Sequence, residues 1–112
     1  MRRLARVACL LGLAACGPSP VAVCAGTHVG TFDGGDVGTL EATLDEKGNV
    51  DMILVAEASG TFDASGEVKR DGSVSAGGLV TIEGQLDLDT CDSEGTWSSR
   101  VGLDGAWSMA LQ

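Results

Sequence analysis

Apolar and polar residues alternate along the chain from about residue 27 onward. In residues 37–44, Leu40, Ala42 and Leu44 fall on one face, while threonine and glutamate fall on the other. A period of two is the pattern of half-buried β-strands, and no segment repeats its apolar residues at the spacing that a long helix requires. The sequence therefore predicts an all-β domain.

Turn sequences divide this alternating region into short segments. Residues 45–49 (DEKGN) and 70–73 (RDGS) are typical of hairpin turns. The strands that the pattern predicts are residues 27–32, 37–44, 50–57, 60–69, 73–76, 79–88, 95–101 and 105–111. Short connections indicate an antiparallel up-and-down meander of about eight strands. Because closure removes exposed edges, we expect the sheet to close, fully or partly, into a small barrel over residues 27–112.

The inward positions of these strands carry large apolar residues. They include Val50, Met52, Leu54, Val80, Ile82, Leu86, Trp97, Val101, Trp107 and Met109. Side chains can fill an eight-stranded barrel, so a filled interior is expected rather than a ligand cavity. A glycine stands two positions before an aromatic residue in GTFD at 30–33 and 60–63, in GTW at 95–97 and in GAW at 105–107. These glycines predict bends or bulges in a curved sheet.

The segment MILVA, residues 52–56, departs from the alternation. Ile53 and Val55 are apolar although they point away from the face that Met52 and Leu54 share. An apolar outer face indicates a covering element, such as a second copy of the chain or another protein, unless the two residues are simply exposed. Ile53 and Val55 are therefore the candidate interface residues.

The first residues have the composition of a signal peptide. Arg2, Arg3 and Arg6 precede an apolar run at residues 7–15 that is too short to span a bilayer. Leu13-Ala14-Ala15-Cys16 then resembles the lipobox of bacterial lipoproteins. The resemblance implies cleavage after residue 15 and acylation of Cys16, which would attach the mature chain to a membrane.

This resemblance also implies the domain organisation and the location. Residues 1–15 are the expected signal peptide, residues 16–26 an extended tether, and residues 27–112 the folded domain. Gly17 follows the cysteine where an aspartate would stand in the inner-membrane sorting pattern, so the chain resembles outer-membrane lipoproteins of the bacterial cell envelope. Beyond the lipobox, the chain is similar to small Gly- and Thr-rich β-meander lipoproteins.

The domain is strongly acidic. Without residues 1–15 it retains 16 acidic residues and four basic ones, a formal charge of −12. Nucleic acids and anionic lipid surfaces favour clustered Lys and Arg, so neither is an expected partner. The charge favours solubility, and it would also attract a basic protein partner.

Two cysteines remain after Cys9 is removed with the signal peptide and Cys16 is acylated. In an oxidising compartment, Cys24 and Cys91 are expected to form a disulfide. The long loop that it closes would stabilise the fold by about 4 kcal/mol. A zinc site is not expected, because two cysteines and His28 fall short of the usual ligand number.

The sequence offers little catalytic chemistry. His28 is the single histidine and hence the only base for a Ser–His or Cys–His pair. The acidic stretch 87–95 carries Asp87, Asp89, Asp92 and Glu94, which could act as a weak calcium site or as paired hydrolytic carboxylates. A solvated loop is the favoured interpretation, because the stretch departs from the EF-hand pattern. We expect neither an enzyme nor a cofactor.

Three functions fit these observations. The leading hypothesis is a membrane-anchored structural or protein-interaction module, which could also be a homodimer. The second is a lipocalin-like carrier of a small apolar ligand, which would need a cavity between the Trp-bearing strands and the strand at 50–57. The third is a small protease inhibitor, to which the chain is similar only in architecture.

Overall fold

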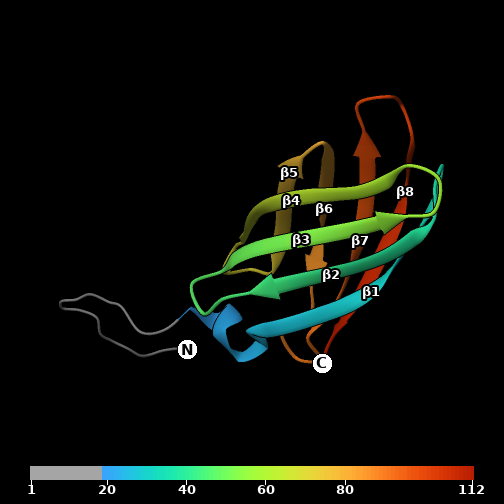
Figure 1. The fold of residues 1–112 in the computed structure, drawn as a ribbon. Helices are drawn as coiled ribbons and strands as arrows, with labels where there is room; N and C mark the ends of the chain where they lie inside the picture. The colour runs from blue at the N-terminus through green and yellow to red at the C-terminus, as the bar shows by residue number, and fades with distance from the viewer. Residues whose placement is uncertain (1–18) are drawn as a thin grey trace, which may run out of the picture.

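The computed structural model describes residues 19–112, which form one closed antiparallel β-barrel (Figure 1). Its strands are β1 (Gly26–Gly34), β2 (Gly38–Leu44), β3 (Asn49–Ala56), β4 (Gly60–Val68), β5 (Ser73–Gly78), β6 (Val80–Leu86), β7 (Asp92–Ser99) and β8 (Asp104–Leu111). Each strand pairs with the next one in sequence, and β8 pairs with β1. The predicted all-β meander and its closure into a barrel are confirmed.

The largest change from the predicted strands concerns β7. It begins at Asp92, three residues before the predicted start, and it ends at Ser99. There the Ser99 amide donates to the Leu103 carbonyl at 2.8 Å and closes a hairpin. Val101 therefore lies in the β7–β8 connection with 83% of its surface exposed. Its predicted inward position is wrong, because the chain turns before the alternation reaches it.

The barrel has two different ends. We call one of them the closed end. Both ends of the described chain, residues 19 and 112, lie there, together with the turns β2–β3, β4–β5 and β6–β7. At the other end, which we call the mouth, lie residues 35–37, 57–59, 79 and 100–103, which connect β1–β2, β3–β4, β5–β6 and β7–β8. In Figure 1 the mouth lies on the right and at the top, away from the grey segment.

A short helix covers the closed end. Residues Pro20–Cys24 were assigned from the sequence to the extended tether, but they form a 3-10 helix, η1. Ser19 caps it, and Pro20 occupies its first position, where a missing amide hydrogen is tolerated. Val21 and Cys24 are fully buried. The chain therefore packs against the barrel before β1 begins.

The Cys24–Cys91 disulfide fastens η1 to the β6–β7 turn, which confirms the predicted pairing. The Cα atoms of the two cysteines are 5.4 Å apart, and the residues are separated by 67 positions in the sequence. Cys91 has a positive φ of 64°, so the turn adopts an unusual backbone conformation where it meets the helix. One covalent bond thus joins the first described segment to the late turn.

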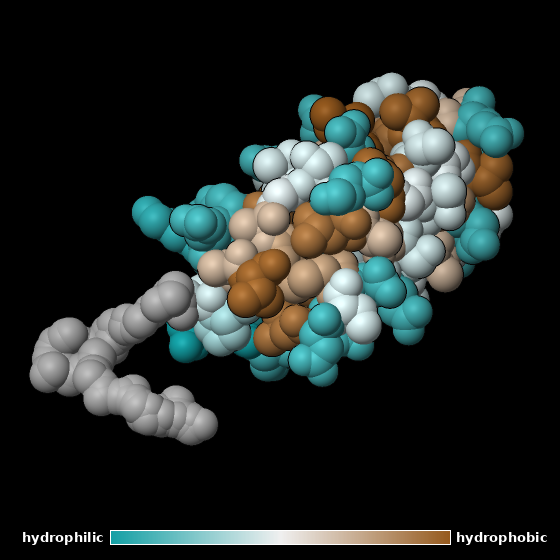
Figure 2. Space-filling model, turned by 90° about the horizontal axis from the view of Figure 1, so that it is seen from below, coloured by the Kyte–Doolittle hydropathy of each residue, from teal (hydrophilic) through white to brown (hydrophobic). Residues whose placement is uncertain are grey.

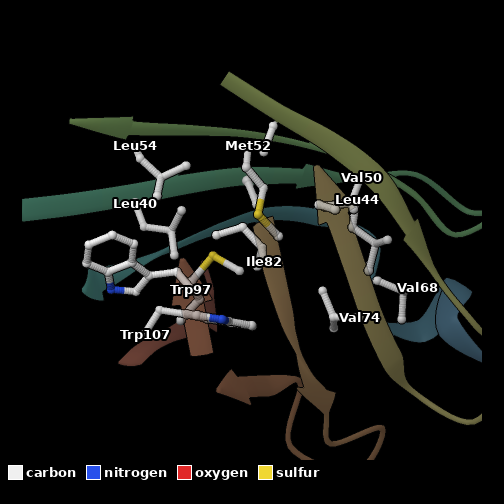
Figure 3. Close-up of a cluster of buried hydrophobic side chains, with 14 of the residues drawn as sticks. Leu40, Leu44, Val50, Met52, Leu54, Val68, Val74, Ile82, Trp97 and Trp107 are labelled. Atoms are coloured by element: carbon white, nitrogen blue, oxygen red, sulfur yellow. The ribbon is translucent and has the colours of Figure 1, made fainter. Parts of the chain in front are cut away.

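The middle of the barrel is filled by side chains. Figure 3 shows Leu40, Leu54 and Trp97 on one side and Leu44, Val50, Val68 and Val74 on the other, with Met52 and Ile82 between them. Leu40, Met52, Leu54 and Ile82 are each at most 2% exposed. Their burial is the main source of stability of such a domain. The predicted filled interior is correct for this middle layer.

The repeated glycines make room for the aromatic side chains. Trp97 lies opposite Gly105 on β8, and Trp107 lies opposite Gly95 on β7. A Cβ atom on Gly105 would come within 2.8 Å of Trp97 Nε1, and one on Gly84 within 2.6 Å of Trp107 Cζ2. Both contacts are closer than packed atoms allow. Glycines on neighbouring strands therefore leave the space that the two indole rings occupy.

Candidate functional site

The mouth holds a pocket of about 300 Å³. Its apolar lining comes from Phe32, Leu54, Ala56, Phe62, Leu79, Val80, Trp97, Val101 and Leu103. The polar lining comes from Asp36, Ser59, Ser99 and Arg100. A concave, mostly apolar space with a few polar groups is the usual form of a small-molecule site.

The filled-interior prediction is wrong at this end of the barrel. On β3 and β7, the large side chains of Leu54 and Trp97 are followed toward the mouth by the smaller inward residues Ala56 and Ser99. The alternation of large apolar residues therefore fills the middle of the barrel but leaves a hollow above it.

Two aromatic rings form one wall of the pocket. Phe32 and Trp97 meet edge to face, with their ring centroids 5.5 Å apart and their planes at 76°. Trp97 Nε1 donates a hydrogen bond of 2.8 Å to the Asp33 carbonyl. Because this bond satisfies the polar atom of the indole, the ring offers the pocket its apolar surface. The two rings are thus held in fixed orientations next to the cavity.

Trp107 is buried in the core of the barrel and does not line this pocket. Its Nε1 lies 3.0 Å from the Thr96 carbonyl and 3.2 Å from the Glu83 carbonyl, and it donates to both. The two tryptophans therefore have different roles, and Trp97 is the one that a bound molecule would touch.

One carboxylate ties two connections of the mouth together. Asp36, 8% exposed, accepts hydrogen bonds from the Val37 amide at 2.8 Å and from the Ala58 amide at 3.3 Å. The Ser59 hydroxyl also donates to it. This last bond is the main reason why the pKa of Asp36 lies below its usual value, while burial acts in the opposite direction. An ionised Asp36 thus joins the β1–β2 connection to the β3–β4 connection.

The rim of the mouth carries exposed apolar side chains. Leu79, on the β5–β6 connection, is 57% exposed, and Val101 lies on the neighbouring β7–β8 connection. Figure 2 shows hydrophobic side chains at this end of the molecule, opposite the grey segment, with hydrophilic ones around them. The apolar surface of the pocket is therefore continued outward at its rim.

His28 lies at the closed end, away from the pocket. Its Nε2 atom is 2.8 Å from the carbonyl oxygen of Cys24, so the ring helps to hold η1. His28 and Ser93 both border a space of only about 20 Å³, and the Ser93 hydroxyl has no hydrogen-bond partner in the described structure. The contact with Cys24 gives His28 a structural role at the closed end.

The acidic stretch does not form a cation site. Asp87 Oδ1 accepts hydrogen bonds from the amides of Asp89 at 2.8 Å and Thr90 at 3.4 Å, which makes a turn. Asp92 and Glu94 lie on β7 instead and point outward. Within residues 19–112, no three potential ligands come together to hold a metal ion. The structure divides the calcium candidate Asp87, Asp89, Asp92 and Glu94 between a turn and the first residues of β7.

The two candidate interface residues lie on the outer wall, as the alternation predicts. Ile53 and Val55 are each 49% exposed on β3. Ile53 stands between Glu41 of β2 and Asp63 of β4, whereas Val55 stands between two threonines. This outer face is separate from the mouth pocket, whose β3 residues point inward.

Cys16, the expected acylation site, lies outside the described residues. Within residues 19–112, no helix is long and apolar enough to cross a membrane. No protein-family model matches the chain, and no curated protein matches it either. Within residues 19–112, the candidate binding surfaces are the mouth pocket with its rim and the outer face of β3.

Proposed function

We propose that this protein binds one small, largely apolar molecule in the mouth of its barrel. The observation that carries the proposal is the pocket of about 300 Å³, whose walls are mainly apolar and aromatic. The disulfide and η1 close the opposite end, so a ligand has one entrance. Of the functions that the sequence allows, a carrier-like role is thus favoured over a purely structural one.

The size of the pocket limits the ligand. A volume of about 300 Å³ corresponds to about ten water molecules at their volume in the liquid. The ligand therefore has about ten non-hydrogen atoms within the pocket. Ligands of this size bind with dissociation constants in about the micromolar to millimolar range.

The proposal includes a lipid anchor on Cys16, which would orient the pocket. Ser19 follows Cys16 by three positions in the sequence, and three steps of extended chain span at most about 11 Å. Since residue 19 lies at the closed end, an acylated Cys16 would hold that end near the membrane. The mouth would then open away from the membrane to which the chain is attached.

The anchor has its own test. The full chain would be expressed in a Gram-negative bacterium that is fed a labelled fatty acid, with Cys16→Ser as the control variant. We expect label on the wild-type chain and none on the variant. Equal labelling of the two chains, or none on either, would reject the anchor and leave the pocket unaffected.

The binding proposal is tested with octan-1-ol, which has an apolar chain of suitable length. Titration into residues 17–112, produced in an oxidising compartment, should shift the emission of Trp97 and give a saturable heat of binding. Trp107→Phe leaves Trp97 as the single tryptophan, so the signal can be assigned to the pocket. Absence of saturable binding would reject the proposal.

Two neighbouring variants show whether binding occurs inside the mouth. Ala56→Phe places a ring in the pocket, whereas Val55→Phe places the same ring on the outer wall. We expect Ala56→Phe to weaken octan-1-ol binding at least tenfold, and Val55→Phe to leave it unchanged. If Ala56→Phe does not fold, Leu103→Trp fills the pocket from the β7–β8 connection. Equal binding by a folded pocket variant and by the wild type would place the ligand elsewhere.

The exposed face of β3 supports a second candidate function, a protein-interaction module. Ile53 and Val55 form an apolar centre, and Glu41 and Asp63 flank it on the adjoining strands. In a homodimer formed through this face, the carboxylates of one copy would lie near the carboxylates of the other, and like charges repel. A basic protein partner fits this face better than a homodimer does.

A further inference from the structure

The basic residues of the domain are divided unequally between the two ends of the barrel. Residues 19–112 contain four of them, and Lys47, Lys69 and Arg70 lie in the turns of the closed end. Arg100 alone lies at the mouth, where it contributes to the lining of the pocket. A guanidinium group thus stands at the edge of an apolar cavity.

Arg100 is available to a ligand, whereas the carboxylate of the pocket is not. Asp36 already accepts hydrogen bonds from Ser59, Val37 and Ala58. Arg100 takes no part in the side-chain hydrogen bonds of the mouth within the described residues. A guanidinium has five N–H donors and no acceptor, so its natural partner is an anionic oxygen group.

We infer that the ligand is an anionic amphiphile, whose apolar chain enters the pocket and whose carboxylate-like head group stays at the rim beside Arg100. This inference rests on the proposed function and adds the chemical class of the ligand. Leu79 and Val101 extend the apolar surface around the entrance, which places the change from apolar to polar surroundings at Arg100. In an amphiphile bound with its chain in the pocket, the junction between the apolar chain and the charged head group would lie at this same place, beside Arg100.

The negative charge of the whole domain acts against an anion at long range. Without residues 1–15 the chain carries a formal charge of −12, but salt at physiological concentration screens exposed charges beyond about 8 Å. A head group in contact with Arg100 lies within that distance. The contact therefore sets the preference among ligands with the same chain, and the overall charge mainly slows the approach of an anion.

The test compares three probes that share an eight-carbon chain: octanoate, octan-1-ol and octylammonium. They are titrated at neutral pH and physiological salt into residues 17–112, and Trp97 emission and calorimetry report the binding. We expect octanoate to bind about three- to tenfold more tightly than octan-1-ol, the range of an exposed charge-assisted contact. Octylammonium should bind more weakly than octan-1-ol.

Variants assign the preference to one side chain. Arg100→Gln should abolish the preference, so that this variant binds octanoate no more tightly than it binds octan-1-ol. Lys69→Gln removes the same charge at the closed end and should change neither. Arg100→Lys should restore part of the preference.

The outcomes separate this inference from the function on which it rests. Octan-1-ol binding as tight as octanoate binding, or tightest binding of octylammonium, would overturn the anionic ligand but keep the apolar pocket. An octanoate preference that survives in Arg100→Gln would overturn the role of Arg100. Absence of binding by all three probes would reject the proposed function itself.

Discussion

The closed end and the mouth of this barrel are built from the same kind of strands, yet they are finished in opposite ways. At the closed end, η1 seals the opening, Val21 and Cys24 are fully buried, and a disulfide fixes the seal. At the mouth, short connections leave a pocket of about 300 Å³ with exposed Leu79 and Val101 around it. One end is built for stability and the other for access.

This difference teaches where a small barrel can place a binding site. A domain of this size has a limited core, so a hollow at one end has to be offset by extra stabilisation elsewhere. The disulfide and the filled middle layer supply that stabilisation here. Changes at the closed end should therefore act on stability first, and changes at the mouth should act on binding first.

Removal of the disulfide should have the largest effect. Replacement of Cys24 and Cys91 by alanine together should lower the free energy of unfolding by about 4 kcal/mol, because the unfolded chain regains the freedom of a long loop. Urea unfolding of the wild-type and variant domains measures this loss. Under conditions where the variant stays folded, octan-1-ol should bind with unchanged affinity. An equally stable variant, or a folded variant without binding, would contradict the separation of the two ends.

A glycine at the mouth should affect both stability and binding. In Gly105→Ala, the new Cβ would lie 1.8 Å from the Asp33 carbonyl oxygen and 2.8 Å from Trp97 Nε1. Relief of this overlap must move the Asp33 carbonyl, which accepts the hydrogen bond of Trp97 Nε1, so we expect a loss of about 1–3 kcal/mol in the free energy of unfolding. The affinity for octan-1-ol should fall at the same time.

The matched control for Gly105 is Gly77 on β5. A Cβ atom on Gly77 would meet nothing within 4 Å. Gly77→Ala should therefore change the free energy of unfolding by at most about 0.5 kcal/mol and leave binding intact. If the two alanine variants behaved alike, the close contact of Gly105 with Trp97 would not be what matters.

Carboxylates at both ends should make the stability of the domain depend on pH. Hydrogen bonds hold the pKa of Asp36 at the mouth, and those of Asp45 and Asp71 in the turns of the closed end, below their usual values. For each of them, the stabilisation is present above the pKa of the unfolded chain, about 3.9, and is lost as the pH falls through the lower pKa of the folded state. The melting temperature should therefore fall as the pH is lowered below about 4.

Asp36→Asn isolates the part of this pH-dependent stabilisation that comes from the mouth. The variant should melt a few degrees below the wild type at pH 7, and this difference should shrink as the pH is lowered through the pKa of Asp36. Thermal unfolding at pH 7 and at pH 3 measures it. A constant difference at the two pH values would mean that the charge of Asp36 contributes nothing to joining the two connections.

The sequence predicted the wall of the barrel far better than its ends. Alternation set the strands because every second residue faces a common core, and the positions of Cys24 and Cys91 were enough to predict their pairing. Asp36 and Arg100 were missed. Both lie in connections, where no periodicity applies, and their proximity to the pocket follows from which connections share an end of the barrel. The first, third, fifth and seventh connections of a meander lie at the same end of the barrel. This rule was the one signal in the sequence that could have placed Asp36 and Arg100 at the same end.

The position of the acidic side chains in β7 and the fold of η1 could not be predicted, for a related reason. Spacing in the sequence grouped Asp87 with Asp92 and Glu94, but the early start of β7 turned the last two outward. The segment at 20–24 begins with a proline and has no strand pattern, which is typical of a tether. It forms η1 because Val21 and Cys24 are buried at the closed end, and this burial is a tertiary contact. Local patterns cannot report such contacts.

The wall between the two ends should give the smallest change in stability. Ile53→Lys with Val55→Lys replaces two side chains that are each 49% exposed, so the free energy of unfolding should change by about 1 kcal/mol or less and octan-1-ol binding should stay the same. Lysines here would also pair with Glu41 and Asp63 on the adjoining strands. If the wild-type domain forms a dimer through this face, light scattering should show the variant as a monomer. An unchanged dimer would place the contact elsewhere, and a loss of octan-1-ol binding would show that the outer wall and the mouth are coupled rather than independent.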